Sequence, residues 1–480
     1  MMTKNKAIQL IVLGSLALMV QSCAIPAITK KDPEVHLPDT FTTLGSDGMN
    51  STATMNWKDF FEDPYLSGLI DTAVANNKEI NILMQRISIA ENEVLARKGE
   101  YMPFVGVGAG AEVEKAARYT RNGAVEENLD IKEGKSFPKY LGNYQFGLVA
   151  SWELDVWKKL RNATKVATME YMASIEGKHF LVTNLVAEVA NSYYELLALD
   201  NELDNLDKNI EIQQQALEVV RQLQQYARTT SLAVKRFEAE VNKNQSQRYE
   251  VKQRIVETEN RINFLLGRIP QPIERASAGF MEINPKILQA GVPSELLENR
   301  PDIRKAQLEL EASKLNIDVA KANFYPSFAL KAGLGFQAFN PRYLFNMPES
   351  VATSFAGDVM APLINRNAIV ATYKNASAEQ IQAAFEYEQT IIKAYIEVSS
   401  QLSNIDNLEK NYALKNHQVD TLTSSIEISN QLFKSARADY MEVLLTQRDA
   451  LEARMDLIET KQKQIMAMVN LYKALGGGWQ

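Results

Sequence analysis

Apolar residues recur at alternating intervals of three and four positions through one long stretch of the chain. Charged or amide residues fill most of the intervening positions, and this heptad spacing is typical of a helix that packs along its length against other helices. The positions are Leu196, Leu199, Leu203, Leu206, Ile210, Gln213, Leu217, Val220, Gln224 and Ala227. A long coiled-coil helix is therefore predicted, followed by a turn near residues 228–231 and a second helical arm that ends at about Leu266.

The same stripe returns 209 positions later in the chain. Its positions are Ile405, Leu408, Tyr412, Lys415, Val419, Leu422, Ile426, Ser429, Phe433 and Ala436. Arg437 matches Arg228 at this offset, and Gly476 matches Gly267. A chain that repeats a long unit at a fixed offset is built as two copies of that unit.

Between the helical arms the apolar period changes to two, which is the pattern of strands with one apolar face. Strands are predicted at about 101–113 and 142–154 in the first half, and at about 326–337 and 353–361 in the second half. The first strand alternates its apolar residues with the very small residues Gly106, Gly108 and Gly110. Pro326 follows Pro103 by 223 positions, which is 14 more than the offset of 209 between the two helical stripes. The loop between the first two strands is therefore longer than its counterpart in the second half, and such length differences are expected of an exposed loop.

Proline-rich stretches separate the parts of the chain. We expect a signal peptide at 1–22, an extended tether with little core of its own at 23–56, a first repeat at 57–267, a linker at 268–300 and a second repeat at 301–480. Within the repeats, an amphipathic helical pattern runs from Trp57 to about Gly99, and another helix runs from Asp302 to Asn323. The fold class that follows is α+β.

The N-terminal residues indicate export. Lys4 and Lys6 precede an apolar run over residues 7–20, which is too short for an ordinary transmembrane helix and suits a signal-peptide core. The next residues, Val20-Gln21-Ser22-Cys23, resemble a bacterial lipobox, and Cys23 is the only cysteine of the chain. We expect cleavage before Cys23 and lipid attachment to it; the alternative is an ordinary cleaved signal with an incidental cysteine.

Composition and charge exclude several classes of function. The chain is 46% hydrophobic and 23% charged, which is ordinary for an ordered protein, and its net charge is −7. Basic residues are spread along the helices, so nucleic acid is not an expected partner. The three histidines are far apart, and the sequence shows no metal-ligand spacing, phosphate loop or nucleophile–base pair. We therefore expect no metal, no cofactor and no enzymatic activity.

The four strands pose a problem of unpaired edges. An open sheet cannot lie in a bilayer, because its edge amides would be unpaired in hydrocarbon, and a membrane barrel needs about eight or more strands. Several chains must therefore share one barrel if these strands span a membrane. The alternative is a soluble four-stranded sheet packed on helices.

Three segments carry a resemblance to a known family. Residues Asn299-Arg300-Pro301-Asp302-Ile303-Arg304, continuing through Ala320–Ser327, are similar to a signature of the TolC-like outer-membrane efflux proteins. Trp152-Glu153-Leu154-Asp155-Val156-Trp157 resembles the strand-to-helix junction of that family. The ending from Leu471 to Trp479 resembles its lipoprotein branch, the NodT-type outer-membrane factors.

The resemblance implies an assembly and its partners. It implies a homotrimer whose chains form one 12-stranded β-barrel and a periplasmic α-helical tunnel, lipid-anchored in the outer membrane of a Gram-negative bacterium. The implied partners are a periplasmic adaptor protein and an inner-membrane pump, usually of the resistance-nodulation-division type. The chain would be a passive exit duct. The alternatives are a duct for type I protein secretion and a non-conducting, lipid-anchored coiled-coil scaffold.

The resemblance also implies a gate at the tips of the helical hairpins. Asp439 and Glu442 would form rings of carboxylates at the periplasmic aperture, with bridges to Arg437 or Arg228. The hairpin-tip residues expected to contact the adaptor are Thr229, Thr230, Ser231, Ala436, Ala438 and Tyr440. The chain departs from the family pattern where Leu445 and Ala233 replace frequent acids and Ala436 replaces a tip glycine. The alternative is that Asp439 and Glu442 are solvated helix charges.

Overall fold

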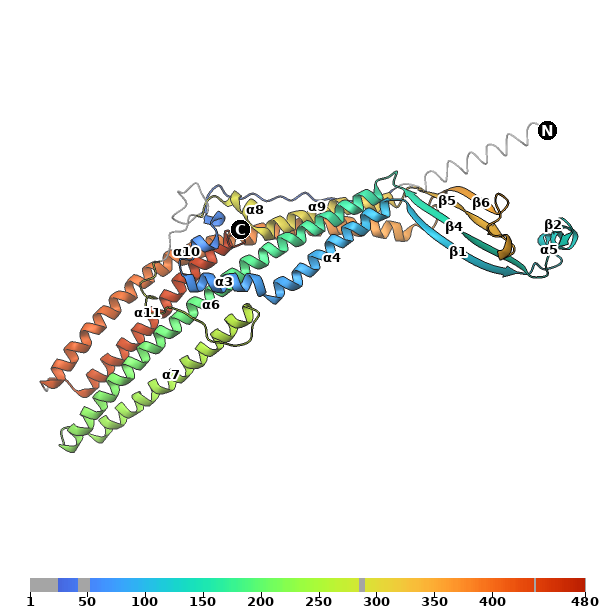
Figure 1. The fold of residues 1–480 in the computed structure, drawn as a ribbon. Coiled ribbons are helices and arrows are strands. Elements are labelled where there is room, and N and C mark those ends of the chain that lie inside the picture. The colour runs from blue at the N-terminus through green and yellow to red at the C-terminus, as the bar shows by residue number, and fades with distance from the viewer. Residues whose placement is uncertain (1–24, 42–51, 285–289, 436, 480) are drawn as a thin grey trace. The chain divides into compact units, whose positions relative to one another are not determined.

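The computed structural model describes residues 25–41, 52–284, 290–435 and 437–479 (Figure 1). Its helices and strands follow one another in two similar series, as the repeat predicts. The first series is α2 (Trp57–Phe60), α3 (Pro64–Asn76), α4 (Lys78–Tyr101), β1 (Phe104–Glu114), α5 (Arg121–Asn128), β2 (Asp130–Lys132), β3 (Lys135–Ser136), β4 (Leu141–Leu154), α6 (Lys159–Gln225) and α7 (Ser231–Leu265). The second series is α8 (Leu296–Asn299), α9 (Pro301–Ala322), β5 (Ser327–Ala338), β6 (Val351–Met360), α10 (Asn367–Lys434) and α11 (Tyr440–Ala474).

The chain divides into two compact units, which are described separately. The sheet unit contains residues 25–32, Ile89–Tyr171 and Leu308–Ala384, and therefore all the strands. The coiled-coil unit contains Pro33–Ser88, Met172–Gln307 and Phe385–Gln480. Among the described helices, none is both long and apolar enough to cross a membrane.

The sheet unit is built on four antiparallel strands in the order β1-β4-β5-β6 (Figure 1). Ala109 pairs with Phe146, and Phe146 pairs with Phe336, so the apolar positions of neighbouring strands share one face. Many large apolar side chains on this face are solvent-exposed, including Val107 and Phe355. The predicted apolar face is therefore present, and no other element among the described residues buries these side chains.

The opposite face carries small and polar residues. One row across the sheet consists of Gly108, Gly147, Gly335 and Ala352, each paired with the next. On the same face, four residues before Gly335 in β5, Lys331 forms an ion pair of 2.8 Å with Asp358 of β6. The strand ends lie within three residues of the predicted bounds.

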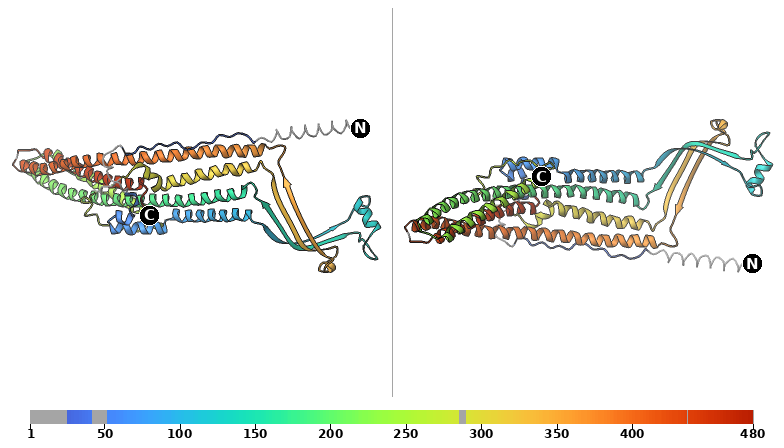
Figure 2. Two further views of the ribbon diagram at one scale, coloured as in Figure 1. Left: turned by 90° about the horizontal axis from the view of Figure 1, so that it is seen from above. Right: turned by 90° about the horizontal axis from the view of Figure 1, so that it is seen from below.

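The coiled-coil unit consists mainly of two helical hairpins, α6–α7 and α10–α11 (Figures 1 and 2). The heptad stripe of α6 is buried against α7 and α11, in one cluster around Leu206, Val251 and Leu451 and another around Leu217 and Phe237. The stripe of α10 is only half-buried over most of its length, and of its described positions only Leu408 and Ser429 are buried. The first stripe therefore has its partners within the chain, whereas much of the second does not.

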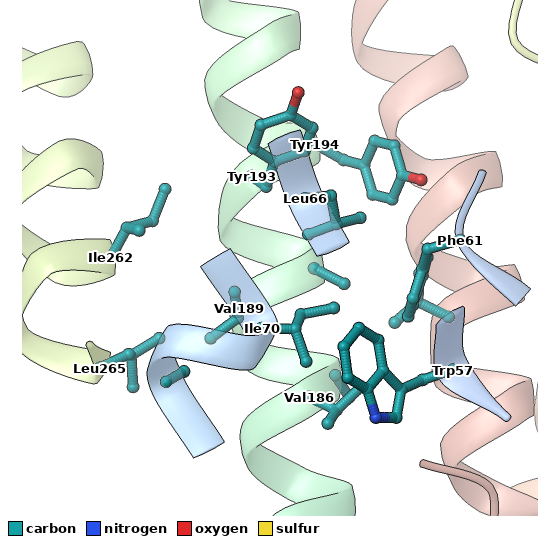
Figure 3. Close-up of a cluster of buried hydrophobic side chains, with 14 of the residues drawn as sticks. Trp57, Phe61, Leu66, Ile70, Val186, Val189, Tyr193, Tyr194, Ile262 and Leu265 are labelled. Carbon is teal, nitrogen blue, oxygen red and sulfur yellow. The ribbon is translucent and has the colours of Figure 1, made fainter. Parts of the chain in front are cut away.

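A large hydrophobic cluster joins the first helices of the chain to the coiled coil (Figure 3). Trp57, Phe61, Leu66 and Ile70 come from α2, α3 and the segment between them, and they pack against Val186, Val189 and Tyr193 of α6 and Ile262 and Leu265 of α7. The Tyr193 hydroxyl donates a hydrogen bond of 2.7 Å to Asp63, the residue that caps α3. Burial and the neighbouring Asp63 raise the pKa of the Tyr193 phenol, so it stays protonated as this donor.

Three features differ from the sequence prediction. The helical pattern from Trp57 to Gly99 is wrong as one run, because Asp63-Pro64 and Asn77 divide it into α2, α3 and α4. The long loop predicted after β1 contains elements that were not predicted, α5 and the β2–β3 hairpin, which are too short to show a period. Residues 25–41 of the predicted tether contain no helix or strand, but Phe41 is buried in a hydrophobic cluster, so this part of the segment makes core contacts.

Candidate functional site

The tip of the first hairpin lies where the sequence predicts a turn. The α6 helix ends at Gln225, Ala227 adopts a left-handed conformation with φ 55°, and the Arg228 N–H donates to the Leu223 carbonyl at 2.8 Å. This backbone arrangement is a common helix ending that usually employs glycine. The Thr230 hydroxyl then caps α7 by accepting a hydrogen bond from the Ala233 N–H. Thr229, Thr230 and Ser231 are therefore tip residues.

The tip of the second hairpin repeats this construction. The Arg437 N–H donates to the Leu432 carbonyl at 2.8 Å, as Arg228 does in the first tip. Asp439 is the N-cap residue of α11, its side chain makes no capping hydrogen bond, and Glu442 lies in the first turn. Ala438 and Tyr440 flank Asp439, whereas the predicted tip residue Ala436 lies outside the described residues.

The four residues predicted for the aperture are not joined to one another within the chain. Arg228, Arg437, Asp439 and Glu442 are all exposed. Among the described residues of the two tips, no ion pair connects either arginine to either carboxylate. Both acids lie at the N-terminal end of α11, where the helix dipole favours a negative charge. Their arrangement suits solvated helix charges within one chain, and a ring can arise only between chains.

The two tips pack on each other through the predicted tip residue Tyr440 and through further residues that the sequence argument did not single out. The rings of Phe237 and Tyr440 lie 6.5 Å apart, and Leu444 and Val234 belong to the same buried cluster. Tyr440 is thus half-buried in the tip, although it was expected to face the adaptor.

An ion-pair network lies beside the first tip. Glu238 accepts hydrogen bonds from Lys235 at 2.8 Å and from Arg221 at 3.0 Å, and these two cations hold the pKa of its carboxyl below the ordinary range. The spacing of Lys235 and Glu238 along the helix could have indicated one of these pairs, but nothing in the sequence points to Arg221.

Aromatic side chains gather where the strands meet the helices, at the strand–helix junction of residues 154–159, 322–327 and 360–367. The indole of Trp152 donates to the Tyr101 carbonyl at 3.0 Å, and that of Trp157 donates to the Pro326 carbonyl at 2.7 Å. The Trp157 ring also stacks on Tyr325, with ring centroids 4.6 Å apart. Tryptophan and tyrosine with a satisfied polar end are typical of the boundary between a membrane and water.

A buried carboxylate starts α6 at this junction. Asp155 accepts hydrogen bonds from the backbone N–H groups of Leu160 at 2.9 Å and Arg161 at 3.0 Å, and from the Arg161 guanidinium. Burial alone would raise the pKa of Asp155, but these donors outweigh it and hold the pKa below its ordinary value.

A buried arginine accounts for the sequence motif at 299–304. Arg300 is 5% exposed and donates to both carboxylate oxygens of Asp302, to Glu397 at 2.9 Å and to the Ala474 carbonyl at 2.8 Å. Burial alone would lower its pKa, but the hydrogen bonds and charges of Asp302 and Glu397 raise it. The arginine thereby joins the start of the second repeat to α10 and to the end of α11.

Known proteins match nearly the whole length of this chain. The outer membrane efflux protein family model matches residues 69–268 and 292–477. The chain is 28% identical to the solvent efflux pump outer membrane protein SrpC of Pseudomonas putida, over 89% of this chain and 88% of that protein. It is 26% identical to the probable outer membrane lipoprotein SilC of Salmonella typhimurium, over 97% of this chain and 98% of that protein.

A solved structure shares the fold. A crystal structure of a membrane protein from Pseudomonas aeruginosa superposes with a TM-score of 0.84 at 22% identity, covering 94% of this chain and 100% of that one. The family match extends through both helical hairpins, all four long strands and the Arg300 cluster. This chain therefore belongs to the outer membrane efflux protein family.

Proposed function

We propose that the chain is the exit duct of a tripartite efflux system, conducting substrates passively from a periplasmic adaptor and an inner-membrane pump to the cell exterior. The observation that carries this proposal is the four-stranded sheet with an exposed apolar face and two unpaired edges. The edge strands β1 and β6 are 11 and 10 residues long. Long open edges of this kind are normally paired or covered, and in a bilayer they must be paired.

Three copies of the chain solve the edge problem. If β6 of one copy pairs with β1 of the next, a homotrimer closes a barrel of twelve strands, with the apolar face toward lipid and the glycine row toward the lumen. The helices also offer a surface for a neighbouring copy, because α10 exposes Leu414 at 74% and Ile428 at 57%. Apolar side chains on a coiled-coil helix that find no partner in their own chain are expected to meet a neighbouring copy.

The partners follow from the position of the hairpin tips. The helices α6 and α10 are 67 and 68 residues long and lead along the chain from the strands β4 and β6 to the hairpin tips, so in an outer-membrane protein we place the tips in the periplasm. We propose that Thr229, Thr230, Ser231 and Ala438, with Ala436, face a periplasmic adaptor, and that the pump beyond it is of the resistance-nodulation-division type. Asp439 and Glu442 of the three copies would surround the aperture.

Cys23 lies outside the described residues, and we propose that it carries the lipid. The lipobox-like residues before it support this, as does the similarity to a probable outer membrane lipoprotein. The lipid would anchor the chain to the inner leaflet of the outer membrane.

Conductance of the purified protein tests the proposal. We expect a cross-linked trimer in detergent and stepwise ion conductance after its addition to planar lipid bilayers. A Thr353→Pro variant, with proline in the edge strand β6, should lose both properties, whereas Thr353→Val at the same position should keep them. A wild-type protein that remains monomeric and does not conduct would instead support the non-conducting scaffold.

A further inference from the structure

Two loops meet at the end of the sheet that lies away from the helices of the sheet unit (Figure 1). The β1–β4 loop carries α5 and the β2–β3 hairpin, and the β5–β6 loop carries the short 3₁₀ helix η3 (Pro341–Tyr343). The Lys132 ammonium group in β2 lies 5.1 Å from the centre of the Tyr343 ring, which joins the two loops. If the helices are periplasmic, as the proposed function requires, this end of the sheet faces the cell exterior.

The β5–β6 loop places an aromatic ring on the apolar face of the sheet at this end. Phe345 packs edge to face on Phe336, with ring centroids 5.4 Å apart, and its ring lies 6.4 Å from that of Phe146. Phe146 and Phe336 are paired residues of β4 and β5 on that face. Phe345 nevertheless remains 66% exposed. Exposed aromatic rings at the end of an apolar face are typical of the level at which a membrane barrel leaves the lipid.

Three cationic side chains lie in the same two loops. Lys132 and Lys135 are directly paired in the β2–β3 hairpin, and Arg342 lies in η3; all three are exposed. Like charges directly opposite each other in a ladder destabilise it. Among the described residues, none of the three forms an ion pair with a carboxylate, although Asp130 and Glu133 are close in the sequence. An anion bound from outside the chain would remove the repulsion.

We propose that the outer-end site, defined as Lys132, Lys135, Arg342 and Phe345, binds a phosphorylated glycolipid of the outer leaflet. The proposal rests on the proposed membrane-spanning sheet and goes beyond it by naming a lipid and the residues that hold it. The phosphates supply the negative charge that the cations lack within the chain, and an arginine can bind a phosphate through two parallel hydrogen bonds. The acyl chains of the same molecule lie against Phe345 and the apolar face. A free phosphate would use the cations and leave the exposed ring without a partner.

Native mass spectrometry of the purified full-length trimer tests the phosphate contact. The delipidated trimer in detergent is titrated with diphosphoryl lipid A and, in parallel, with the same lipid after removal of its phosphates. We expect the wild type to bind the first probe and to bind the second far more weakly. The triple variant Lys132→Gln, Lys135→Gln, Arg342→Gln should lose roughly tenfold to hundredfold in affinity for the first probe, because each cation near a charged lipid surface contributes a factor of about five.

The matched control removes the same number of charges from the helices of the sheet unit. It is the triple variant Lys98→Gln, Lys321→Gln, Lys374→Gln, whose lysines are exposed and form no ion pair within the described part of the chain. This control should bind diphosphoryl lipid A as the wild type does. Equal affinities in the wild type and both triple variants overturn the proposal, and so does equal affinity of the wild type for the phosphorylated and the dephosphorylated lipid.

The variant Phe345→Ala tests whether the partner is a lipid or a free phosphate. It should bind diphosphoryl lipid A about threefold to tenfold more weakly, because the acyl chains lose their contact with the ring. Its affinity for the deacylated, phosphorylated disaccharide of the same lipid should equal that of the wild type. No loss for the intact lipid, or an equal loss for both probes, overturns the lipid as the partner.

The wild-type conductance, measured on the same preparation, separates this proposal from the one on which it rests. A trimer that conducts but binds the lipid as well after loss of the three cations contradicts only the outer-end site. A preparation that neither forms trimers nor conducts contradicts the proposed function, and the outer-end site with it.

Discussion

Gly147 of β4 and Gly335 of β5 face each other so closely that a Cβ atom on Gly147 would lie 2.5 Å from the Cα of Gly335. They belong to the row of small residues on the face opposite the apolar one. They bring together the two central strands, β4 of the first repeat and β5 of the second. A side chain here would force the strands apart, because the atom it meets is backbone. The close approach lets the sheet curve toward this face, as a narrow barrel requires.

The first prediction concerns this pair. Gly335→Ala would place its Cβ 2.5 Å from the Phe146 carbonyl oxygen and 2.6 Å from the Gly147 Cα. We expect this variant to lose most of its detergent-stable trimer, measured as the band that resists unheated electrophoresis. Gly108→Ala is the control in the same row, because no atom of the part of the chain that the structure describes lies within 4 Å of its added Cβ. Wild-type yields of trimer from Gly335→Ala would contradict the role given to the close approach.

The second prediction concerns the buried arginine. Arg300→Ala leaves the carboxylate of Asp302 partly buried without its partner, and removing one member of a buried ion pair typically costs about 3–5 kcal/mol. We expect a large fall in the temperature at which the assembled protein dissociates. Lys314→Ala on α9, the helix that contains Asp302, removes an exposed pair with Glu311 and should change stability by less than about 0.5 kcal/mol. Similar dissociation temperatures for the two variants would show that Arg300 is not the link between the repeats.

The third prediction concerns pH and the start of α6. The pKa of Asp155 is lower in the folded chain than its ordinary value of 3.8, so its ionised form stabilises the fold above that pH. This contribution is lost as the pH falls below 3.8 and through the folded-state pKa. We expect hydrogen-exchange protection of residues 160–164 to decline across that window in the wild type.

The variant Asp155→Asn separates this effect from general acid unfolding. Its amide cannot accept at both positions, so protection at neutral pH should fall by about 1 kcal/mol, the usual cost of a lost helix cap. Protection in the variant should then depend less on pH below 3.8 than in the wild type. Parallel pH profiles in the two proteins would remove Asp155 as the cause.

Periodicity explains how much of the fold could be predicted from the sequence. The α6 stripe around Leu206 and the alternation around Phe146 reflect side chains that all face one way, so the pattern along the chain shows the buried face directly. Periodicity does not show that the helical run is divided at Asn77 into α3 and α4. Asn77 caps α4 through its side-chain oxygen and donates to the distant Leu265 carbonyl, and an amphipathic pattern continues across it.

Contacts between distant residues explain what the sequence could not show. Arg300 meets Glu397 and the Ala474 carbonyl, which lie 97 and 174 positions away, and only the fold brings them together. The hydrogen bond from the Lys31 N–H to Gln380 is hidden for a similar reason, because these two residues lie 349 positions apart. The aperture residues were found only through a family resemblance, since nothing about Asp439 or Glu442 differs locally from an ordinary helix start.

The last prediction concerns the aperture, and it depends on whether three copies bring Asp439 and Glu442 into rings. Six carboxylates around one opening would raise the local concentration of cations, so the double variant Asp439→Asn, Glu442→Gln should lower the permeability ratio of K⁺ to Cl⁻, measured as reversal potential in planar bilayers. If bridges between chains to Arg228 or Arg437 also narrow the opening, the same variant should raise single-channel conductance.

Glu409→Gln on α10 is the matched control for this experiment, since it removes an exposed carboxylate from a helix position 25 residues before Lys434, the last residue of α10. It should leave both the reversal potential and the conductance unchanged. Equal values for the double variant, the control and the wild type would mean that Asp439 and Glu442 are solvated helix charges. A lower permeability ratio without a change in conductance would place the carboxylates at the opening but exclude the bridges as a constriction, because breaking a constriction must increase the current.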